Sequence, residues 1–250
     1  MALVTGAAGG IGRALTAVLV RDGFAVGALD NNAASLDELM TAYPLVDRDR
    51  VLPLVADVRE RTEVEAAVEK LAATFGEPTA VALGSGVLRP ARLEAVGESD
   101  WSWHLDVNAT GTFHLLQTVV PRLRTGSSIV LIGSNAASVP RVGMAAYAAS
   151  KAAAEALVRC AALELAQRGI RCNVIEPGST DTNMQHDLWP DPEIGRASAI
   201  HGDPASFRIG IPLGRIADPT DVAELAAFLL SDRARHVTLQ TVRVDGGASL

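Results

Sequence analysis

A tyrosine and a lysine four residues apart, Tyr147 and Lys151, are the pair in this chain whose types and spacing most directly suggest chemistry. They lie in a segment with helical periodicity, where a spacing of four puts both side chains on one face, within reach of a common ligand. A tyrosine near its ordinary pKa of about 10 is a poor base at neutral pH. Because a nearby ammonium favours the phenolate, we expect Lys151 to bring the pKa of Tyr147 toward the range of an acid–base catalyst.

Two polar residues upstream are candidates for the same site. Ser134 follows a predicted strand, 13 residues before Tyr147, and its hydroxyl can donate to or accept from a substrate oxygen. Asn108 lies within the helix expected after Trp103. A Tyr-x-x-x-Lys pair alone is a weak signal, because surface helices carry such pairs by chance. Its combination with Ser134 and with a glycine-rich turn near the N-terminus argues against chance.

That turn is Thr5-Gly6-Ala7-Ala8-Gly9-Gly10-Ile11-Gly12, and it follows the first β-branched run. Glycines let the backbone turn tightly and approach a pyrophosphate, which would then lie at the positive N-terminal end of the next helix. The spacing is T-G-x-x-x-G-x-G rather than G-x-G-x-x-G, because the third residue after Gly12 is Leu15. The alternative is a merely tight strand–helix connection.

Acidic residues end the second and third predicted strands. Asp30 stands 18 residues after Gly12, where a carboxylate can accept hydrogen bonds from the adenosine ribose hydroxyls and would repel a 2′-phosphate. NAD is therefore favoured over NADP, although Asp30 can also cap the following helix. Asp57 is expected at the same edge of the sheet, where it could reach the adenine amino group or act only as a turn residue.

Short β-branched runs alternate along the chain with longer segments of helical periodicity. This alternation predicts the strands and helices that position the residues described above. Strands are expected at Ala2–Thr5, Ala25–Asp30, Val51–Ala56, Ala80–Ala82, Ser128–Ile132, Arg171–Glu176 and Thr241–Val244. Helices are expected at Ile11–Arg21, Glu63–Phe75, Asp106–Arg122, Ala146–Gln167 and Thr220–Ser231. Strands separated by helices require crossover connections. We therefore predict one doubly wound α/β (Rossmann) domain over residues 1–250, with a mostly parallel seven-stranded sheet and helices on both faces.

One long section breaks this alternation. The segment from Pro177 to Asp218 is rich in proline and glycine and has no strong periodicity. A segment of this length inside a compact domain is usually a functional lid or binding loop, and we place a substrate-binding lid at about residues 179–215. Gly169 is expected to end the long helix before it, and Pro219 and Thr220 to start the last helix.

Composition narrows the class of protein. Apolar residues make up 48% of the 250 residues and charged residues 20%, which excludes a disordered chain. Lys and Arg number 22 against 29 Asp and Glu, so the net charge of −7 lacks the electrostatic footprint of a nucleic-acid or anionic-membrane binder. The chain has no stretch of 18 uninterrupted apolar residues, so no membrane span is expected. No signal peptide is expected either, because the glycine-rich turn begins at Gly6.

The cysteines and histidines carry no metal or disulfide signal. Cys160 and Cys172 have neither ligand nor framework spacing, and we expect both to be small buried apolar residues, consistent with a reducing cytoplasm. The histidines show no ligand spacing, so no metal site is expected; they are His104, His114, His186, His201 and His236.

Taken together, these motifs resemble the short-chain dehydrogenase/reductase family over the whole chain. The resemblance rests on the glycine-rich turn, Asp57, Asn108, Ser134, Tyr147-x-x-x-Lys151 and Pro177-Gly178. It implies a single NAD(P)-binding domain and generally a tetramer. It implies that Tyr147 is the acid–base residue, and that Lys151 lowers its pKa and holds the nicotinamide ribose. It also implies that Ser134 polarises the substrate oxygen and that Asn108 supports a water-linked proton relay.

The resemblance also implies where the cofactor binds. The residues that correspond to the family's cofactor site are Gly6, Gly10, Ile11, Gly12, Asp30, Asp57, Val58, Gly86, Tyr147, Lys151, Pro177, Gly178, Thr180 and Thr182.

Several further stretches of the sequence resemble a narrower group within the family, the 2,3-dihydro-2,3-dihydroxybenzoate dehydrogenases. These are residues 140–144 (PRVGM), 171–174 (RCNV), 177–185 (PGSTDTNMQ), 210–214 (GIPLG) and 237–240 (VTLQ). The group makes the catechol acid of siderophores, so the resemblance implies oxidation of the ring alcohol of a cyclohexadiene carboxylic acid, with transfer of hydride to NAD. The dienone formed can tautomerise to an aromatic ring, which makes the oxidation effectively one-way.

A substrate carboxylate is best held by an arginine. Arg141, between Ser134 and Tyr147 in the sequence, is the first candidate and Arg89 the second, although a surface arginine is the alternative for Arg141. The other residues expected to bind the substrate are Ser134, Met144, Met184 and Gln185, with Trp189 as a further candidate for closing over the ring. Met184 and Trp189 could equally pack the lid.

The sequence departs from the family's pattern at two positions. Leu83 replaces an asparagine that ties the central sheet to a neighbouring helix, and Asn135 replaces an aspartate that the dihydroxybenzoate enzymes carry after the serine. Asn135 is the one hint toward an alternative substrate with a 2-amino group, dihydro-3-hydroxyanthranilate. An alternative of another class is a nucleotide-sensing protein without catalysis, which Leu83 alone favours.

Overall fold

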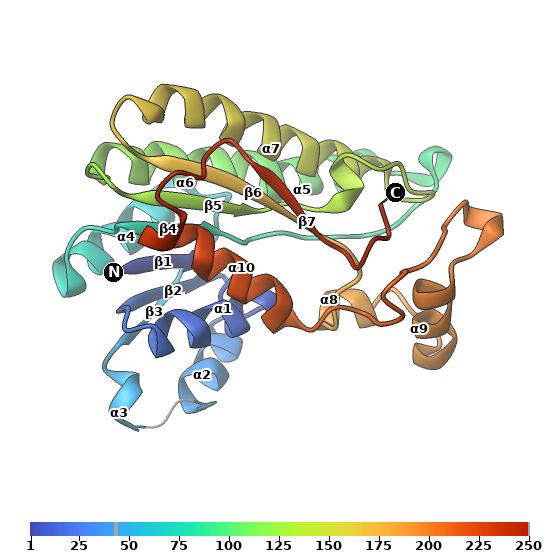
Figure 1. The fold of residues 1–250 in the computed structure, drawn as a ribbon, viewed down its shortest axis with the longest axis horizontal. Coiled ribbons are helices and arrows are strands. Elements are labelled where there is room, and N and C mark those ends of the chain that lie inside the picture. The colour runs from blue at the N-terminus through green and yellow to red at the C-terminus, as the bar shows by residue number, and fades with distance from the viewer. Residues whose placement is uncertain (43–44, 250) are drawn as a thin grey trace.

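Seven strands form one parallel sheet in a computed structural model that describes residues 1–42 and 45–249 (Figure 1). The strand order is β3-β2-β1-β4-β5-β6-β7. The strands are β1 (Ala2–Thr5), β2 (Val26–Asp30), β3 (Val51–Val55), β4 (Ala80–Leu83), β5 (Ser128–Ile132), β6 (Arg171–Pro177) and β7 (Thr241–Val244). The order reverses between β1 and β4, and the carboxyl ends of the strands beside such a switch point form a ligand-binding crevice in doubly wound sheets.

Helices cover both faces of this sheet (Figure 1). They are α1 (Gly10–Arg21), α2 (Ala33–Ala42), α3 (Leu45–Arg48), α4 (Arg61–Phe75), α5 (Glu98–His104), α6 (Gly111–Val119), α7 (Ala145–Ala166), α8 (Asn183–His186), α9 (Pro192–His201) and α10 (Pro219–Leu230). A π-helical turn, Leu105–Thr110, joins α5 to α6. The predicted fold class is therefore confirmed.

The core divides into two clusters because side chains alternate across the sheet. From β1, Val4 points into a cluster with α1 and α10, whereas Leu3 points into a cluster with α4, α6 and α7. All four residues of β1 are buried, as expected of a strand covered on both faces. This packing fixes the central strands, and with them the turns at their carboxyl ends.

Several predictions of local structure are confirmed and others are wrong. Gly169 has a φ of +68°, which fits the expected end of α7. Asp218 caps α10 in a capping box with Asp221, and Pro219 is the first helical residue. The section 177–218 is not wholly irregular, because it contains α8 and α9. Cys160 is exposed on α7 rather than buried. No helix in the described ranges is long and apolar enough to span a bilayer.

Candidate active site

The glycine-rich turn between β1 and α1 is shaped so closely that side chains would not fit. Gly6 has a φ of +65°, and a Cβ on Gly12 would lie 2.0 Å from the Gly6 carbonyl oxygen. A Cβ on Gly10 would lie 2.5 Å from the Thr182 methyl, so the start of the lid rests on this turn. The helix begins at Gly10 with no side-chain cap, which leaves its first backbone N–H groups, those of Ile11 among them, available to an anion. The turn therefore fits a pyrophosphate.

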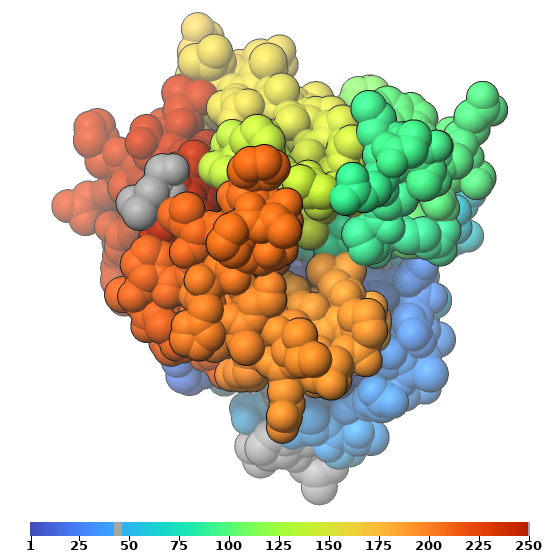
Figure 2. All heavy atoms as spheres, turned by 90° about the vertical axis from the view of Figure 1, so that its right-hand side faces the viewer, coloured from blue at the N-terminus to red at the C-terminus, as the bar shows by residue number. Residues whose placement is uncertain are grey.

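A cavity of about 800 Å³ extends from this turn across the carboxyl ends of the strands. It is lined by all of the predicted cofactor-site residues and by the predicted substrate residues. Figure 2 views the molecule from the side of the lid, whose orange segment lies across this face. The structure thus brings the separately predicted motifs into one site of a volume suited to a cofactor and a small substrate.

Asp30, at the end of β2, lines one end of the cavity. Its Oδ2 accepts the Ala8 N–H at 3.0 Å and its Oδ1 accepts the Asn32 N–H at 3.1 Å. Asp30 does not cap α2 itself, because that contact is made by Asn32, whose Oδ1 accepts the Ser35 N–H. The carboxylate is thereby held in place while it still faces the cavity.

The two arginines at this end are already paired with carboxylates. Arg13 lies 3.0 Å from Glu38 and also donates to the Ala8 carbonyl. Arg59 forms a salt bridge of 2.6 Å with Asp57 and lowers the pKa of that carboxyl. Asp57 is thus both a turn residue and part of the cavity wall. Next to it, buried Val58 packs against Gly111 of α6.

Tyr147 and Lys151 lie on one face of α7 and both are buried, as the spacing predicts. The Lys151 Nζ donates to the Ile132 carbonyl at 3.1 Å and lies 6.0 Å from the centre of the Tyr147 ring. Burial lowers the pKa of Lys151 to about 8. Burial also raises the pKa of Tyr147, opposed by a hydrogen bond with Ser134. The expected lowering of the Tyr147 pKa is therefore wrong for this arrangement, because desolvation outweighs the neighbouring groups.

Ser134 stands at the carboxyl end of β5, directly against Tyr147. Its Oγ accepts the Ala136 N–H at 3.2 Å and so caps the short 3₁₀ turn Asn135–Ala137. Because this contact uses the oxygen as an acceptor, the hydroxyl hydrogen stays free to serve Tyr147 or a substrate oxygen.

The Asn108 side chain is fully occupied by the protein. Within the π-helical turn, its Oδ1 accepts the Val87 N–H at 2.8 Å, and its Nδ2 donates to the Val87 carbonyl and to Ser150 Oγ. The side chain thus fixes the chain after β4 against α7. A Cβ on Gly86 would lie 2.9 Å from Lys151 Nζ, so a side chain at this position would displace the lysine ammonium. Asn108 is therefore placed to hold the site together, and the predicted proton relay is left as a prediction.

At the other end of the cavity lie two arginines without partners. Arg141 and Arg208 are both half-buried and line the same cavity as Tyr147, and neither guanidinium makes a hydrogen bond or ion pair with any described residue. The Nε of Arg208 is buried and unpaired. Burial, together with the charge of Arg208, lowers the pKa of Arg141. Arg208 was missed by the sequence reasoning, because a lone arginine in the lid carries no motif.

The remaining candidates for substrate contact divide between the cavity and the surface. Met144, Met184, Gln185 and Trp189 all line the cavity. Arg89 does not: it is exposed, pairs with Asp100 and stacks on Trp103 at 4.8 Å. The second candidate for the carboxylate is therefore wrong.

At the cofactor end of the lid, β6 ends in Pro177, and three residues after it fix the start of that segment. A Cβ on Gly178 would lie 2.6 Å from the Cβ of Asp245, which fixes glycine at this position. Buried Thr180 donates to the Gly178 carbonyl at 3.1 Å, and Thr182 caps α8.

The two departures from the family pattern have local explanations. Leu83 is buried in the core. The chain after β4 is held to β1 by the Thr5 hydroxyl, which accepts the N–H groups of Gly84 and Ser85, and to α7 by Asn108 through Val87 and Ser150. The Nδ2 of Asn135 donates to Ser249 at 3.1 Å and to Asp245 at 3.4 Å. An aspartate at position 135 would face the Asp245 carboxylate, so the amide serves the fold.

The family model described as "Enoyl-(Acyl carrier protein) reductase" matches residues 6–249. With this match, the parallel sheet and the assembled Ser134, Tyr147 and Lys151, the chain belongs to the short-chain dehydrogenase/reductase family of nicotinamide-dependent oxidoreductases.

Individual relatives indicate a narrower group within the family. The chain is 41% identical to the vibriobactin-specific 2,3-dihydro-2,3-dihydroxybenzoate dehydrogenase of Vibrio cholerae, covering 99% of this chain and 95% of the relative. It is 39% identical to the 2,3-dihydro-2,3-dihydroxybenzoate dehydrogenase of Bacillus subtilis, covering 100% and 96%.

Solved structures of the family show the same fold with either cofactor. A 3-ketoacyl-(acyl-carrier-protein) reductase from Brucella melitensis complexed with NADH superposes with a TM-score of 0.86 at 27% identity, covering 100% of this chain and 98% of that one. A short-chain dehydrogenase from Burkholderia cenocepacia complexed with NADP gives 0.87 at 30% identity, covering 100% and 97%.

Proposed function

We propose that this protein is an NAD-dependent dehydrogenase that oxidises 2,3-dihydro-2,3-dihydroxybenzoate to 2,3-dihydroxybenzoate for siderophore biosynthesis. The two relatives named above support the reaction. The observation in the structure that carries the substrate class is the pair of unpartnered guanidiniums, Arg141 and Arg208, in the cavity that holds Tyr147.

Two half-buried positive charges that face one cavity repel each other, and the carboxylates that act on them, Asp245 on Arg141 and Asp203 on Arg208, form no ion pair with either, so an anion between the two arginines would be stabilised. A ring carboxylate supplies that charge and accepts the paired N–H groups of an arginine. Bound there, the carboxylate would hold the ring near Tyr147, with Met144 and Met184 as apolar walls. A neutral alcohol would leave both cations unpaired.

NAD is the proposed cofactor because of the charges at the adenine end. Asp30 would accept from the ribose hydroxyls and repel a 2′-phosphate. Arg13 and Arg59 also line the cavity, but each already has a carboxylate partner, Glu38 and Asp57. No described arginine at this end is thus free to bind a phosphate.

In the proposed reaction Tyr147 removes the proton of the substrate's ring hydroxyl, while Ser134 hydrogen-bonds the same oxygen. Because burial raises the pKa of Tyr147, its phenolate depends on the Ser134 hydrogen bond and on the positive charge of Lys151 for stabilisation. Bound along the residues from Gly6 to Gly12 and at Asp30, NAD would supply the acceptor for the hydride of the carbinol carbon. Lys151, with a pKa of about 8, is mostly an ammonium at neutral pH and supplies positive charge beside the phenol. The dienone then tautomerises to the aromatic ring, which draws the oxidation to completion.

The test is the rate of NADH formation with the dihydro-dihydroxy acid, with its 2-amino counterpart and with the diene diol that lacks a carboxylate. We expect turnover of the first and little with the neutral diol. Equal rates with acid and neutral diol would contradict the proposed substrate class. Asn135 also lines the cavity while its Nδ2 donates to Asp245 and Ser249, so the rate with the 2-amino acid decides that alternative.

The assembly and location belong to the same proposal. Family resemblance suggests a homotetramer in the cytoplasm, acting without nucleic acid or membrane. Light scattering during size-exclusion chromatography measures the mass, and a monomer of 26.1 kDa would contradict the tetramer.

A further inference from the structure

Two buried carboxyl groups, those of Glu155 and Glu176, lie close together beside the segment from Ser134 to Ser138. Glu155 is on α7, two helical turns after Tyr147, and Glu176 is near the end of β6. Their side chains are only 3% and 2% exposed. Glutamates are almost never this buried unless they are paired, and each of these two has one half-exposed arginine as its partner, Arg159 for Glu155 and Arg243 for Glu176. The reaction described above assigns no role to either carboxyl.

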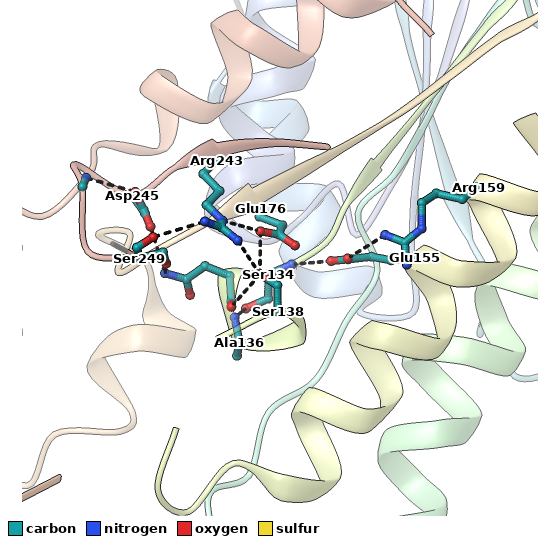
Figure 3. A network of polar contacts seen from close by, with 11 residues as sticks. Ser134, Ala136, Ser138, Glu155, Arg159, Glu176, Arg243, Asp245 and Ser249 are labelled. Atoms are coloured by element: carbon teal, nitrogen blue, oxygen red, sulfur yellow. Dashed lines mark hydrogen bonds and ion pairs between the residues drawn. The ribbon is translucent and has the colours of Figure 1, made fainter. Parts of the chain in front are cut away.

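Glu176 is firmly anchored. Its Oε2 accepts from Arg243 Nε and from Ser138 Oγ, both at 2.9 Å, and Arg243 also donates to Ser138 (Figure 3). Glu176 therefore connects β7 with the turn that follows Ser134, and Arg243 balances one negative charge.

Glu155 reaches the backbone on the other side of Ser134. Its Oε1 accepts the Ser134 N–H at 3.4 Å, and its Oε2 lies 3.6 Å from Arg159 (Figure 3). A Cβ on Gly133 would lie 2.3 Å from the same Oε1, so the carboxyl packs directly on the Gly133 backbone. The residues on both sides of the catalytic hydroxyl are thus held by this one network.

We propose that Glu155 is a positioning residue, which shares a proton with Glu176 and thereby fixes the Gly133–Ser134 backbone so that the Ser134 hydroxyl is held against Tyr147. A protonated Glu155 donates its O–H to Glu176, while its other oxygen still accepts the Ser134 N–H. With one proton between them, the two carboxyls carry a single negative charge, which Arg243 neutralises.

The protonation state of Glu155 is sensitive to neutral pH. Burial and the neighbouring Glu176 raise the pKa of Glu155 to about 7, against the opposing effects of the Ser134 N–H and Arg159. The charged and titratable groups that face Glu155 are Tyr147, Lys151 and Arg159 on α7, Glu176 on β6 and, through Glu176, Arg243 on β7.

Ionisation of Glu155 changes the catalytic groups in a defined direction. A negative charge at Glu155 raises the pKa of both Tyr147 and Lys151. Below about pH 7 Glu155 is neutral and this effect is absent; above about pH 7 it is present. The carboxyl pair therefore couples the ambient pH to the acid–base residue without touching the substrate.

Two substitutions separate positioning from mere packing. Glu155→Gln keeps the acceptor for Ser134 and a donor for Glu176 but cannot ionise, whereas Glu155→Ala removes both contacts. Glu164→Gln, at an exposed position of the same helix, is the matched control. The measurements are the pH profile of kcat/KM for the diene acid or any alcohol the enzyme oxidises, the separate kcat and KM values, and the thermal unfolding midpoint.

We expect Glu155→Gln to match the wild type near pH 6 and to diverge above about pH 7, with its profile shifted to lower pH. Glu155→Ala should lose about tenfold in kcat at every pH with little change in KM for NAD, and glutamine should restore most of it. Coincident profiles of wild type and Glu155→Gln, or equal kcat for Glu155→Ala and wild type, would overturn the proposal.

An infrared measurement tests the shared proton without turnover. The carboxyl C=O band that disappears between about pH 6 and pH 8 in the wild type should be absent from Glu155→Gln and present in Glu164→Gln. Loss of turnover on the diene acid with this band intact would refute the proposed substrate and leave the carboxyl pair standing. A band that persists in Glu155→Gln would refute the pair.

Discussion

Replacing Arg208 by leucine removes one of the two cations that we assign to the substrate carboxylate. Leucine fills a similar apolar volume in the lid, and the guanidinium has no partner among the described residues, so the folded chain loses no hydrogen bond. A hydrogen bond to a charged group contributes about 1.5–3 kcal/mol. Since 1.36 kcal/mol is a factor of ten, kcat/KM for the diene acid should fall about 10- to 150-fold.

The assay is initial-rate NADH formation with wild type, Arg208→Leu, Arg208→Lys and the exposed control Arg92→Leu. Lysine keeps the charge without the paired N–H geometry and should fall between wild type and leucine. The loss should appear with the acid and vanish with the neutral diol, because only the acid has a carboxylate to hold. An unchanged kcat/KM for Arg208→Leu, or an equal loss on both substrates, would refute the carboxylate assignment.

Three further predictions concern the rest of the site. Tyr147→Phe should lower kcat about 10²- to 10⁴-fold while cofactor binding, followed by NADH fluorescence, persists; loss of both would indicate a structural defect, and full activity would favour a sensor. Asp30→Ala should reduce the preference for NAD over NADP about 10- to 150-fold, measured as the ratio of kcat/KM values; an unchanged ratio would refute the ribose contact. Because Tyr147 has a raised pKa and Lys151 a pKa of about 8, kcat/KM should rise with pH up to about pH 8 and then level off as the ammonium is lost, and a rise that continues to about pH 10 would contradict the role of Lys151.

Much of the fold and of the site could be predicted because it is determined by residues that are close together in the sequence. The turn at Gly6–Gly12 follows a buried strand and precedes an amphipathic helix, and Tyr147 and Lys151 share a helix whose period fixes their common face. In a parallel sheet the carboxyl ends of all strands lie along the same edge. Asp30 and Ser134 can therefore be placed at that edge from the strand prediction alone, without information on distant contacts.

The rest depends on contacts between segments that no local pattern records. Arg208 becomes a substrate candidate only when the lid folds over the cavity, and Glu155 interrupts an alanine-rich stretch like an ordinary surface charge. The direction of the Tyr147 pKa was mispredicted for a related reason: spacing shows that Lys151 is near, but the cost of desolvation follows from how completely α7 is covered. The Asn108 side chain likewise finds its partners in Val87 and Ser150.

Because Gly133 lies so close to the Glu155 carboxyl, the residues tolerated at position 133 depend on the residue at position 155. Alanine at 133 collides with Oε1 at 2.3 Å, but its next contacts, with Ile175 and Val174, are at 3.1 Å and need a shift of only a few tenths of an ångström. A lineage that shortens residue 155 first can therefore accept a methyl group at 133 afterwards, whereas the reverse order passes through a clash. The contact therefore restricts the order of the two substitutions: the methyl group at 133 follows the loss of the glutamate, and the glutamate returns only after residue 133 has reverted to glycine.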